Sequence, residues 1–269
     1  MNALQGPVFD FHVRLAPRPG ARERLLDVLD GCGIDRAAVA AGGTIELGRL
    51  SRQLIEGGHI ETDAGNDEVL AACSDERLVP FYFANPHRDA TVYATAAKDF
   101  RGLEISPAVH GVALTDTRVA ELVAVAEDAG HPVYVVCIQR PGCGVADLVA
   151  LAERFPEVTF VLGHSGVGNI DFYGVELITP RPNIALETSG GYTTVVRDAL
   201  DVLGADRVLF GSEFPLQHPS VELAKFAALD VTPEQWHQVA WANAVRLLTP
   251  ETWKERTDDA DRAPAPTAR

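Results

Sequence analysis

The chain has few basic residues for its length and no long hydrophobic run. Its 23 lysines and arginines stand against 38 aspartates and glutamates, a formal net charge of -15. Nucleic-acid phosphates and anionic membrane surfaces attract basic surfaces, so this balance argues against both as partners. No apolar stretch approaches the roughly 20 residues that a transmembrane helix requires. We expect no nucleic acid and no membrane as partners, and we favour a small molecule or another protein.

Cysteine is also scarce, and its spacing matches no common metal or redox motif. The four cysteines, Cys32, Cys73, Cys137 and Cys143, include no CxxC pair. The first residues lack the basic segment followed by an apolar one that marks a secretory signal. We therefore expect a cytoplasmic protein with reduced thiols.

A glycine-rich phosphate turn is missing as well, because Gly42-Gly43 after an early strand is too sparse for one. An open doubly wound sheet, which also alternates strands and helices, would normally carry such a turn. The 269 residues suffice for one α/β barrel, which needs about 250. We predict a single-domain (β/α)8 TIM barrel over residues 1–253 and a polar, aperiodic tail over residues 254–269.

Short β-branched or aromatic runs alternate with stretches of helical period along the chain, as repeated βα units do. Helices are predicted at residues 91–100, 117–129, 145–155 and 195–203. Eight strands are predicted, at residues 8–15, 37–40, 78–84, 102–106, 133–138, 159–162, 183–187 and 208–211.

Polar residues stand at or after the predicted strands, where the active site of a parallel barrel gathers. Asp10, His12 and Arg14 alternate along the first strand and are expected to share one face. Further polar residues lie in or after the later strands: Glu104, His164, Glu187 and Glu213. A purely hydrophobic core would not use these residues, so we expect them at the barrel mouth.

Four segments and a closing helix resemble a known family. The first strand, VFDFHVR at residues 8–14, resembles a DxHxH pattern, and the later landmarks are GLEISP at 102–107, LGHSG at 162–166, FGSEFP at 210–215 and NAVRLL at 243–248. Their order and spacing, up to about Leu248, resemble the amidohydrolase superfamily. The resemblance is to its amidohydrolase-related group, which includes aminocarboxymuconate semialdehyde decarboxylase and related hydrolases and decarboxylases.

The resemblance implies one divalent metal, held by two first-strand histidines, a fifth-strand histidine and an eighth-strand aspartate. A sixth-strand histidine then orients or activates water. Here Arg14 replaces the second first-strand histidine, Val136 stands at the fifth-strand position with Cys137 next to it, and Glu213 replaces the aspartate. Glu104 stands where a basic residue is common, while His12 and His164 are retained.

These departures leave two interpretations of the pocket. An arginine offers only donors and repels a cation, which favours a pocket with no metal or other cofactor, held by Arg14 between Glu104 and Glu213. Alternatively His12, His164 and Glu213, with Cys137 as a further candidate, hold one divalent metal, zinc above others, if Arg14 turns away.

The predicted function is an amidohydrolase-like enzyme that acts on a small polar substrate by hydrolysis or by a related lyase or isomerase reaction. The expected catalytic residues are His12, Arg14, His164 and Glu213, and the expected substrate-binding residues are Glu104, Glu187 and His110. Without a metal, His164 or Glu213 would move a proton and Arg14 would stabilise negative charge.

The alternative is a non-catalytic barrel retained as a binding or partner protein. Against it, a decayed site should drift toward small or apolar residues, whereas Arg14, Glu104 and Glu213 are costly to bury. The resemblance also makes a homodimer reasonable.

Overall fold

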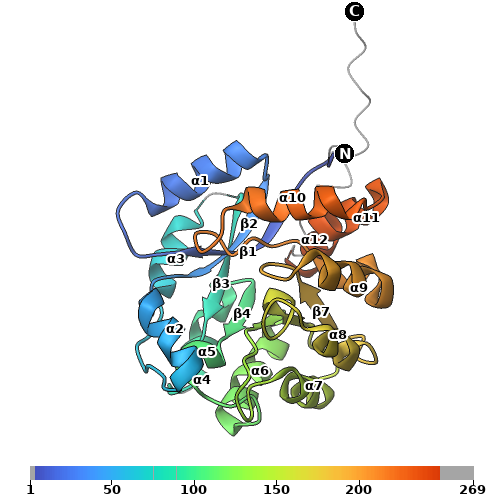
Figure 1. Cartoon of the computed structure of the whole chain (residues 1–269). Coiled ribbons are helices and arrows are strands. Elements are labelled where there is room, and N and C mark those ends of the chain that lie inside the picture. The colour runs from blue at the N-terminus through green and yellow to red at the C-terminus, as the bar shows by residue number, and fades with distance from the viewer. Residues whose placement is uncertain (1–3, 75, 89, 249–269) are drawn as a thin grey trace, which may run out of the picture.

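Eight parallel strands follow one another around a barrel in chain order, with helices packed outside them (Figure 1). The computed structural model describes residues 4–74, 76–88 and 90–248. The strands are β1 (Phe9–Leu15), β2 (Arg36–Ala41), β3 (Leu78–Phe83), β4 (Gly102–Ile105), β5 (Val133–Val135), β6 (Phe160–Leu162), β7 (Ile184–Glu187) and β8 (Val208–Leu209). The predicted TIM barrel and its eight strands are confirmed.

The helices follow the strands as the βα alternation predicts. They are α1 (Ala21–Cys32), α2 (Leu47–Glu56), α3 (Asn66–Ala72), α4 (Ala90–Ala96), α5 (Pro107–His110), α6 (Thr117–Ala129), α7 (Val145–Arg154), α8 (Phe172–Ile178), α9 (Thr193–Leu203), α10 (Pro219–Leu229), α11 (Pro233–His237) and α12 (Asn243–Leu248). The predicted tail at 254–269, and the domain boundary at 253, lie outside the described residues. In the part of the chain that is described, no helix has both the length and the apolar character needed to cross a membrane.

The last strand is shorter than predicted because its backbone changes partners. The amide of Phe210 donates to the carbonyl oxygen of Val239 at 3.0 Å rather than to β7. In the same segment the carbonyl of Phe210 accepts from the amide of Phe11, and the carbonyl of Phe214 accepts from Arg14 at 2.7 Å. These bonds join the start and the end of the barrel and bring Glu213 next to β1.

Successive side chains along a strand point to opposite faces of the sheet and belong to two different hydrophobic clusters. Ala37 and Val39 belong to the large cluster that includes the helices, whereas Ala38 and Ala40 belong to a smaller one. The smaller cluster takes residues from seven strands and from α12, so it fills the barrel interior and its base. It is made of Phe9, Phe11, Ala38, Ala40, Val79, Phe81, Tyr134, Val161, Ala185, Leu209, Ala244 and Leu248.

One interior contact gives a stability prediction. A Cβ on Gly102 would lie 2.2 Å from the ring of Phe81, which is buried. We expect Gly102→Ala to destabilise the protein by about 1–3 kcal/mol because the ring must leave its position. Gly31, in α1, has nothing within 4 Å of its added Cβ, so Gly31→Ala should instead stabilise by about 0.5–1 kcal/mol. Urea unfolding of both variants checks the opposite signs, and equal shifts would contradict this packing.

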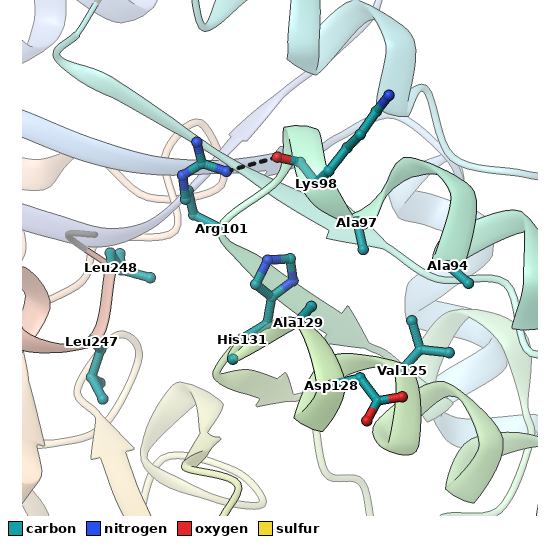
Figure 2. A pocket seen from close by; sticks show the side chains of 11 residues that line it. Ala94, Ala97, Lys98, Arg101, Val125, Asp128, Ala129, His131, Leu247 and Leu248 are labelled. Atoms are coloured by element: carbon teal, nitrogen blue, oxygen red, sulfur yellow. Dashed lines mark hydrogen bonds between the residues drawn. The ribbon is translucent and has the colours of Figure 1, made fainter. Parts of the chain in front are cut away.

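A cavity of about 660 Å³ opens at the opposite end of the barrel from the strand C-termini (Figure 2). His131, which precedes β5, lines it together with Lys98 and Arg101. The His131 Nδ1 atom lies 2.7 Å from the hydroxyl oxygen of Tyr93. This end of a TIM barrel contributes stability rather than chemistry.

The buried His131 is expected to cause part of the protein's loss of folding stability at low pH. Burial, more than the nearby Arg101, lowers the pKa of His131 from 6.5 to about 4. The unfolded chain therefore binds more protons between these values, and stability is lost as pH falls from about 6.5 to about 4. His131→Asn should remove about 2 kcal/mol of that loss. The check is urea unfolding at pH 7 and pH 4.5; an unchanged difference between the two pH values in the variant would contradict it.

Candidate functional site

A second cavity, of about 450 Å³, opens at the C-terminal ends of the strands. Polar side chains from three strand ends reach it: Arg14 near the end of β1, His164 after β6 and Glu213 after β8. Much of the remaining wall is apolar and comes from the segment after β2 and from α5. These wall residues include Ala41, Ile45, Leu47, Leu50, Phe83, Ala108, Val109, Val136 and Leu216.

Arg14 joins two carboxylates at the base of this cavity. Its Nη2 atom donates to Oε1 of Glu104 at 2.7 Å, and its Nε atom lies 3.4 Å from Oε1 of Glu213. Glu104 is fully buried, which by itself would raise its pKa, but Arg14 and then His12 outweigh burial and lower the pKa to about 2. Glu104 is therefore ionised, and Arg14 is held more tightly by Glu104 than by Glu213.

His12 lies against the inner wall between the same groups. Its ring stacks on Tyr134, with centroids 4.1 Å apart and planes at 8°. Its Nε2 atom is 3.2 Å from Oε2 of Glu104. Among the described residues, Nδ1 of His12 has no hydrogen-bond partner although it is buried. This nitrogen is therefore available to contact a group bound in the site.

His164 and Glu213 face each other, and both have left-handed backbone conformations. Their φ values are 57° and 56°. Residues with a Cβ adopt this conformation at an energetic cost, and such strained residues are concentrated at functional sites. His164 Nδ1 lies 3.2 Å from Oε2 of Glu213 and 2.8 Å from Oγ of Ser189. Burial would raise the pKa of Glu213, but His164 and Arg14 lower it. The carboxylate is thus charged where it meets His164.

Glu187 lies below His164 rather than in the cavity wall. One of its carboxylate oxygens accepts from the hydroxyl of Tyr134 at 2.7 Å and from the amide of His164 at 3.1 Å, and Oγ of Ser189 donates to it at 2.9 Å. Glu187 is fully buried, and these three bonds fix the backbone that presents His164. Its observed contacts position neighbours and do not reach the cavity.

Two further predicted residues lie outside the cavity. His110 is buried behind Phe83, 5.5 Å from its ring, with Nε2 3.2 Å from the carbonyl oxygen of Thr62. Asp10 does not share a free face with Arg14, because the register of β1 shifts between Asp10 and Val13. Its carboxylate accepts instead from the amides of His12 and Ser212.

The cavity and its surroundings unite five of the predicted residues: His12, Arg14, Glu104, His164 and Glu213. Tyr134 and Ser189 were not predicted as site residues. The sequence offers one signal for each. Tyr134 is the one phenol in an otherwise aliphatic strand, and Ser189 lies two residues after Glu187. One ligand atom from each of His12, His164 and Glu213 lies within 4.8 Å of the others, which is the spacing of a metal-ligand group.

The amidohydrolase family profile matches residues 9–249, and the chain therefore belongs to this family. A γ-resorcylate decarboxylase from Polaromonas sp. strain JS666 is 26% identical over 118 residues, a match that covers 36% of this chain and 36% of that protein. The match thus spans about a third of the curated relative.

Two solved structures share the fold over most of both chains. A 5-carboxyvanillate decarboxylase from Novosphingobium aromaticivorans, complexed with manganese, is 15% identical with a TM-score of 0.68, covering 89% of this chain and 95% of that one. A dihydroxybenzoic acid decarboxylase from Polaromonas sp. JS666, with bound manganese and 2-nitroresorcinol, is 15% identical with a TM-score of 0.67, covering 90% and 97%. The prediction of an amidohydrolase-family enzyme is confirmed by the family match.

The prediction of a pocket without a cofactor is wrong. The two solved decarboxylases hold manganese, and this chain groups His12, His164 and Glu213 at metal-ligand spacing. The error lay in the charge assigned to Arg14, which was expected to repel a cation. Glu104 takes up that charge at 2.7 Å, and Glu213 adds a second carboxylate. The three groups together carry one net negative charge, which attracts a divalent cation.

Proposed function

We propose that this protein is a divalent-metal-dependent lyase that removes a carboxyl group from a small aromatic acid. The observation that carries the proposal is the meeting of His12, His164 and Glu213 at one end of a largely apolar cavity that also exposes Arg14. Apolar walls of this kind suit an aromatic ring, and a guanidinium suits a carboxylate. The relatives described above are decarboxylases of hydroxylated aromatic acids, which supports the same reaction class.

The residues present fit a divalent cation. His12, His164 and Glu213 would hold it, because they supply two imidazole nitrogens and a charged oxygen, a ligand set that manganese and zinc both accept. The unpartnered Nδ1 of His12 marks a nitrogen that protein contacts leave unused. When bound, the cation polarises substrate oxygens and stabilises negative charge that develops during the reaction.

The other residues of the cavity orient the substrate. Arg14 keeps its side chain 17% exposed, so part of the guanidinium remains able to donate to a substrate carboxylate while Glu104 fixes its position. The ring of Phe83 lies 5.5 Å from the Arg14 guanidinium carbon and supports it by a cation–π contact. Ile45, Leu50 and Val109 supply apolar wall against which an aromatic ring can pack and from which water is excluded.

The test is carbon dioxide release from aromatic acids by protein stripped of metal and reloaded with Mn²⁺ or Zn²⁺. Suitable substrates are 2,6-dihydroxybenzoate and 5-carboxyvanillate, with benzoate as the control that lacks ring oxygens. We expect release only with a metal present and only from the hydroxylated acids. Metal-dependent hydrolysis of amides or esters without carbon dioxide release would exclude the lyase. Binding of the acids without turnover under every metal would support the non-catalytic barrel instead.

A further inference from the structure

We infer that His59, Glu61 and His87 form a second divalent-cation site, suited to zinc, at the rim of the barrel and separate from the cavity. One ligand atom from each lies within 4.8 Å of the others. Nε2 of His59 is 3.5 Å from Oε1 of Glu61, and Nδ1 of His87 is 4.0 Å from the same oxygen. Two imidazoles and a carboxylate form a ligand set that zinc takes in proteins, with a fourth position left for water.

His87 is oriented by a group outside the cluster. Its Nε2 atom lies 2.9 Å from the backbone carbonyl oxygen of His110. A carbonyl oxygen only accepts, so Nε2 carries the proton and the lone pair is on Nδ1, the atom nearest Glu61. Histidines that bind metals are ordinarily held in this way, by donating their other ring N–H to a carbonyl or carboxylate. His110 is 1% exposed, so the accepting carbonyl belongs to a buried and fixed residue.

His59 is held close to the same segment by Gly111. Gly111 has a φ of 68°, and a Cβ there would lie 2.6 Å from Cβ of His59. Only a glycine gives this approach without displacement. Arg140 ties down the chain just before His59, because its guanidinium donates to the carbonyls of Gln53 at 2.9 Å and Gly58 at 3.1 Å. The two ligand segments are thus placed before any ion arrives, which lowers the ordering cost of binding.

The ordinary alternative is a solvated histidine–glutamate cluster with no ion. Glu61 is 63% exposed and His59 is 48% exposed, so an exposed ion pair between them would contribute little to stability. A cation changes that, because it joins the segment between α2 and α3 to the loop after β3 that carries His87. That segment follows α2, whose Leu47 and Leu50 form part of the cavity wall. Binding at the rim would therefore stiffen one wall of the cavity.

The experiment compares zinc uptake by the whole chain with uptake by three single variants. Metal-stripped protein is dialysed against Zn²⁺ alone, and bound zinc per chain is measured over a range of free zinc. His59→Ala and Glu61→Gln should each bind one zinc fewer per chain, or bind that zinc at least about tenfold more weakly, since even outer partners of a ligand change affinity by 10–100-fold. His237→Ala, at an exposed histidine on α11, should bind as the unmodified chain does.

A second readout separates a lost site from a damaged fold. Without zinc, His59→Ala should unfold at the same temperature as the unmodified chain because the side chain is half exposed. With zinc, the rise in unfolding temperature should be smaller in His59→Ala than in the unmodified chain. The comparison depends on a difference between variants, so it holds whether or not the cavity residues also load. Equal zinc uptake by the unmodified chain, His59→Ala and Glu61→Gln would overturn the inference, and so would an equal loss in His237→Ala.

Discussion

Arg14→Met is expected to destabilise the protein by about 3 kcal/mol at pH 7, because removal of one partner leaves a buried charge without compensation. The charge is that of Glu104, which is fully buried and takes its shortest ion-pair contact, 2.7 Å, from Arg14. Methionine keeps much of the arginine's length and apolar stem, so the loss measures the charge more than the packing. Urea unfolding of the metal-stripped protein is the measurement.

The pH dependence identifies Glu104 as the cause. In the unmodified chain the pKa of Glu104 is lowered to about 2, whereas burial without Arg14 raises the pKa of a carboxyl. The variant can therefore recover stability by protonating Glu104, and its deficit should be smaller at pH 5 than at pH 8. Glu104→Gln added to Arg14→Met should restore more than half of the lost stability.

An exposed ion pair supplies the control for Arg14. Arg118 contacts Asp116 at 2.8 Å, but its side chain is 45% exposed. Arg118→Met should cost less than about 1 kcal/mol. If Arg14→Met costs no more than Arg118→Met, Arg14 is a bystander and the ion-pair account of the cavity fails.

The alternation of strand and helix patterns was sufficient to predict the barrel, because each βα unit carries its own period and its own apolar face. The ends of the strands were less predictable. β8 stops at Leu209, since the next amide bonds to Val239, a residue 29 positions further along the chain that local propensity does not reveal. The same kind of long-range pairing shifts the register of β1 and turns Asp10 toward the backbone of Ser212.

The candidate site, too, could be predicted from the sequence only in part. Residue type and position at strand ends were enough to bring His12, Arg14, His164 and Glu213 together as candidates. The preferred ion-pair partner of Arg14 could not be predicted, because Arg14 can pair with either of two carboxylates. Only the distances, 2.7 Å to Glu104 and 3.4 Å to Glu213, show that Glu104 is the closer partner. That choice reverses the argument about the metal, since Glu104 takes up the charge of Arg14 and the Oε2 atom of Glu213 faces Nδ1 of His164 at 3.2 Å.

Glu213→Gln is expected to weaken manganese binding in the cavity by at least about a hundredfold, the upper end of what outer-shell changes produce. The glutamine side chain has the size of the glutamate side chain, and the substitution keeps the hydrogen bond from the backbone amide of residue 213 to the carbonyl oxygen of His12. What it removes is one negative charge, which brings the sum over Arg14, Glu104 and residue 213 from one net negative charge to none. The substitution thus replaces a charged ligand oxygen by a neutral one and also weakens the electrostatic attraction for the cation.

The measurement is equilibrium dialysis of metal-stripped protein with Mn²⁺, carried out in a His59→Ala background so that the rim residues do not contribute. Glu46→Gln is the matched control. Glu46 lines the same cavity, yet its carboxylate accepts from the amides of Gly48 and Arg49 at the start of α2, and manganese binding should change less than twofold. Carbon dioxide release should fall in parallel with bound manganese in Glu213→Gln and persist in Glu46→Gln. Undiminished manganese binding by Glu213→Gln would mean that the carboxylate between Arg14 and His164 serves the ion pair alone, and that the cation of any reaction is held by other residues.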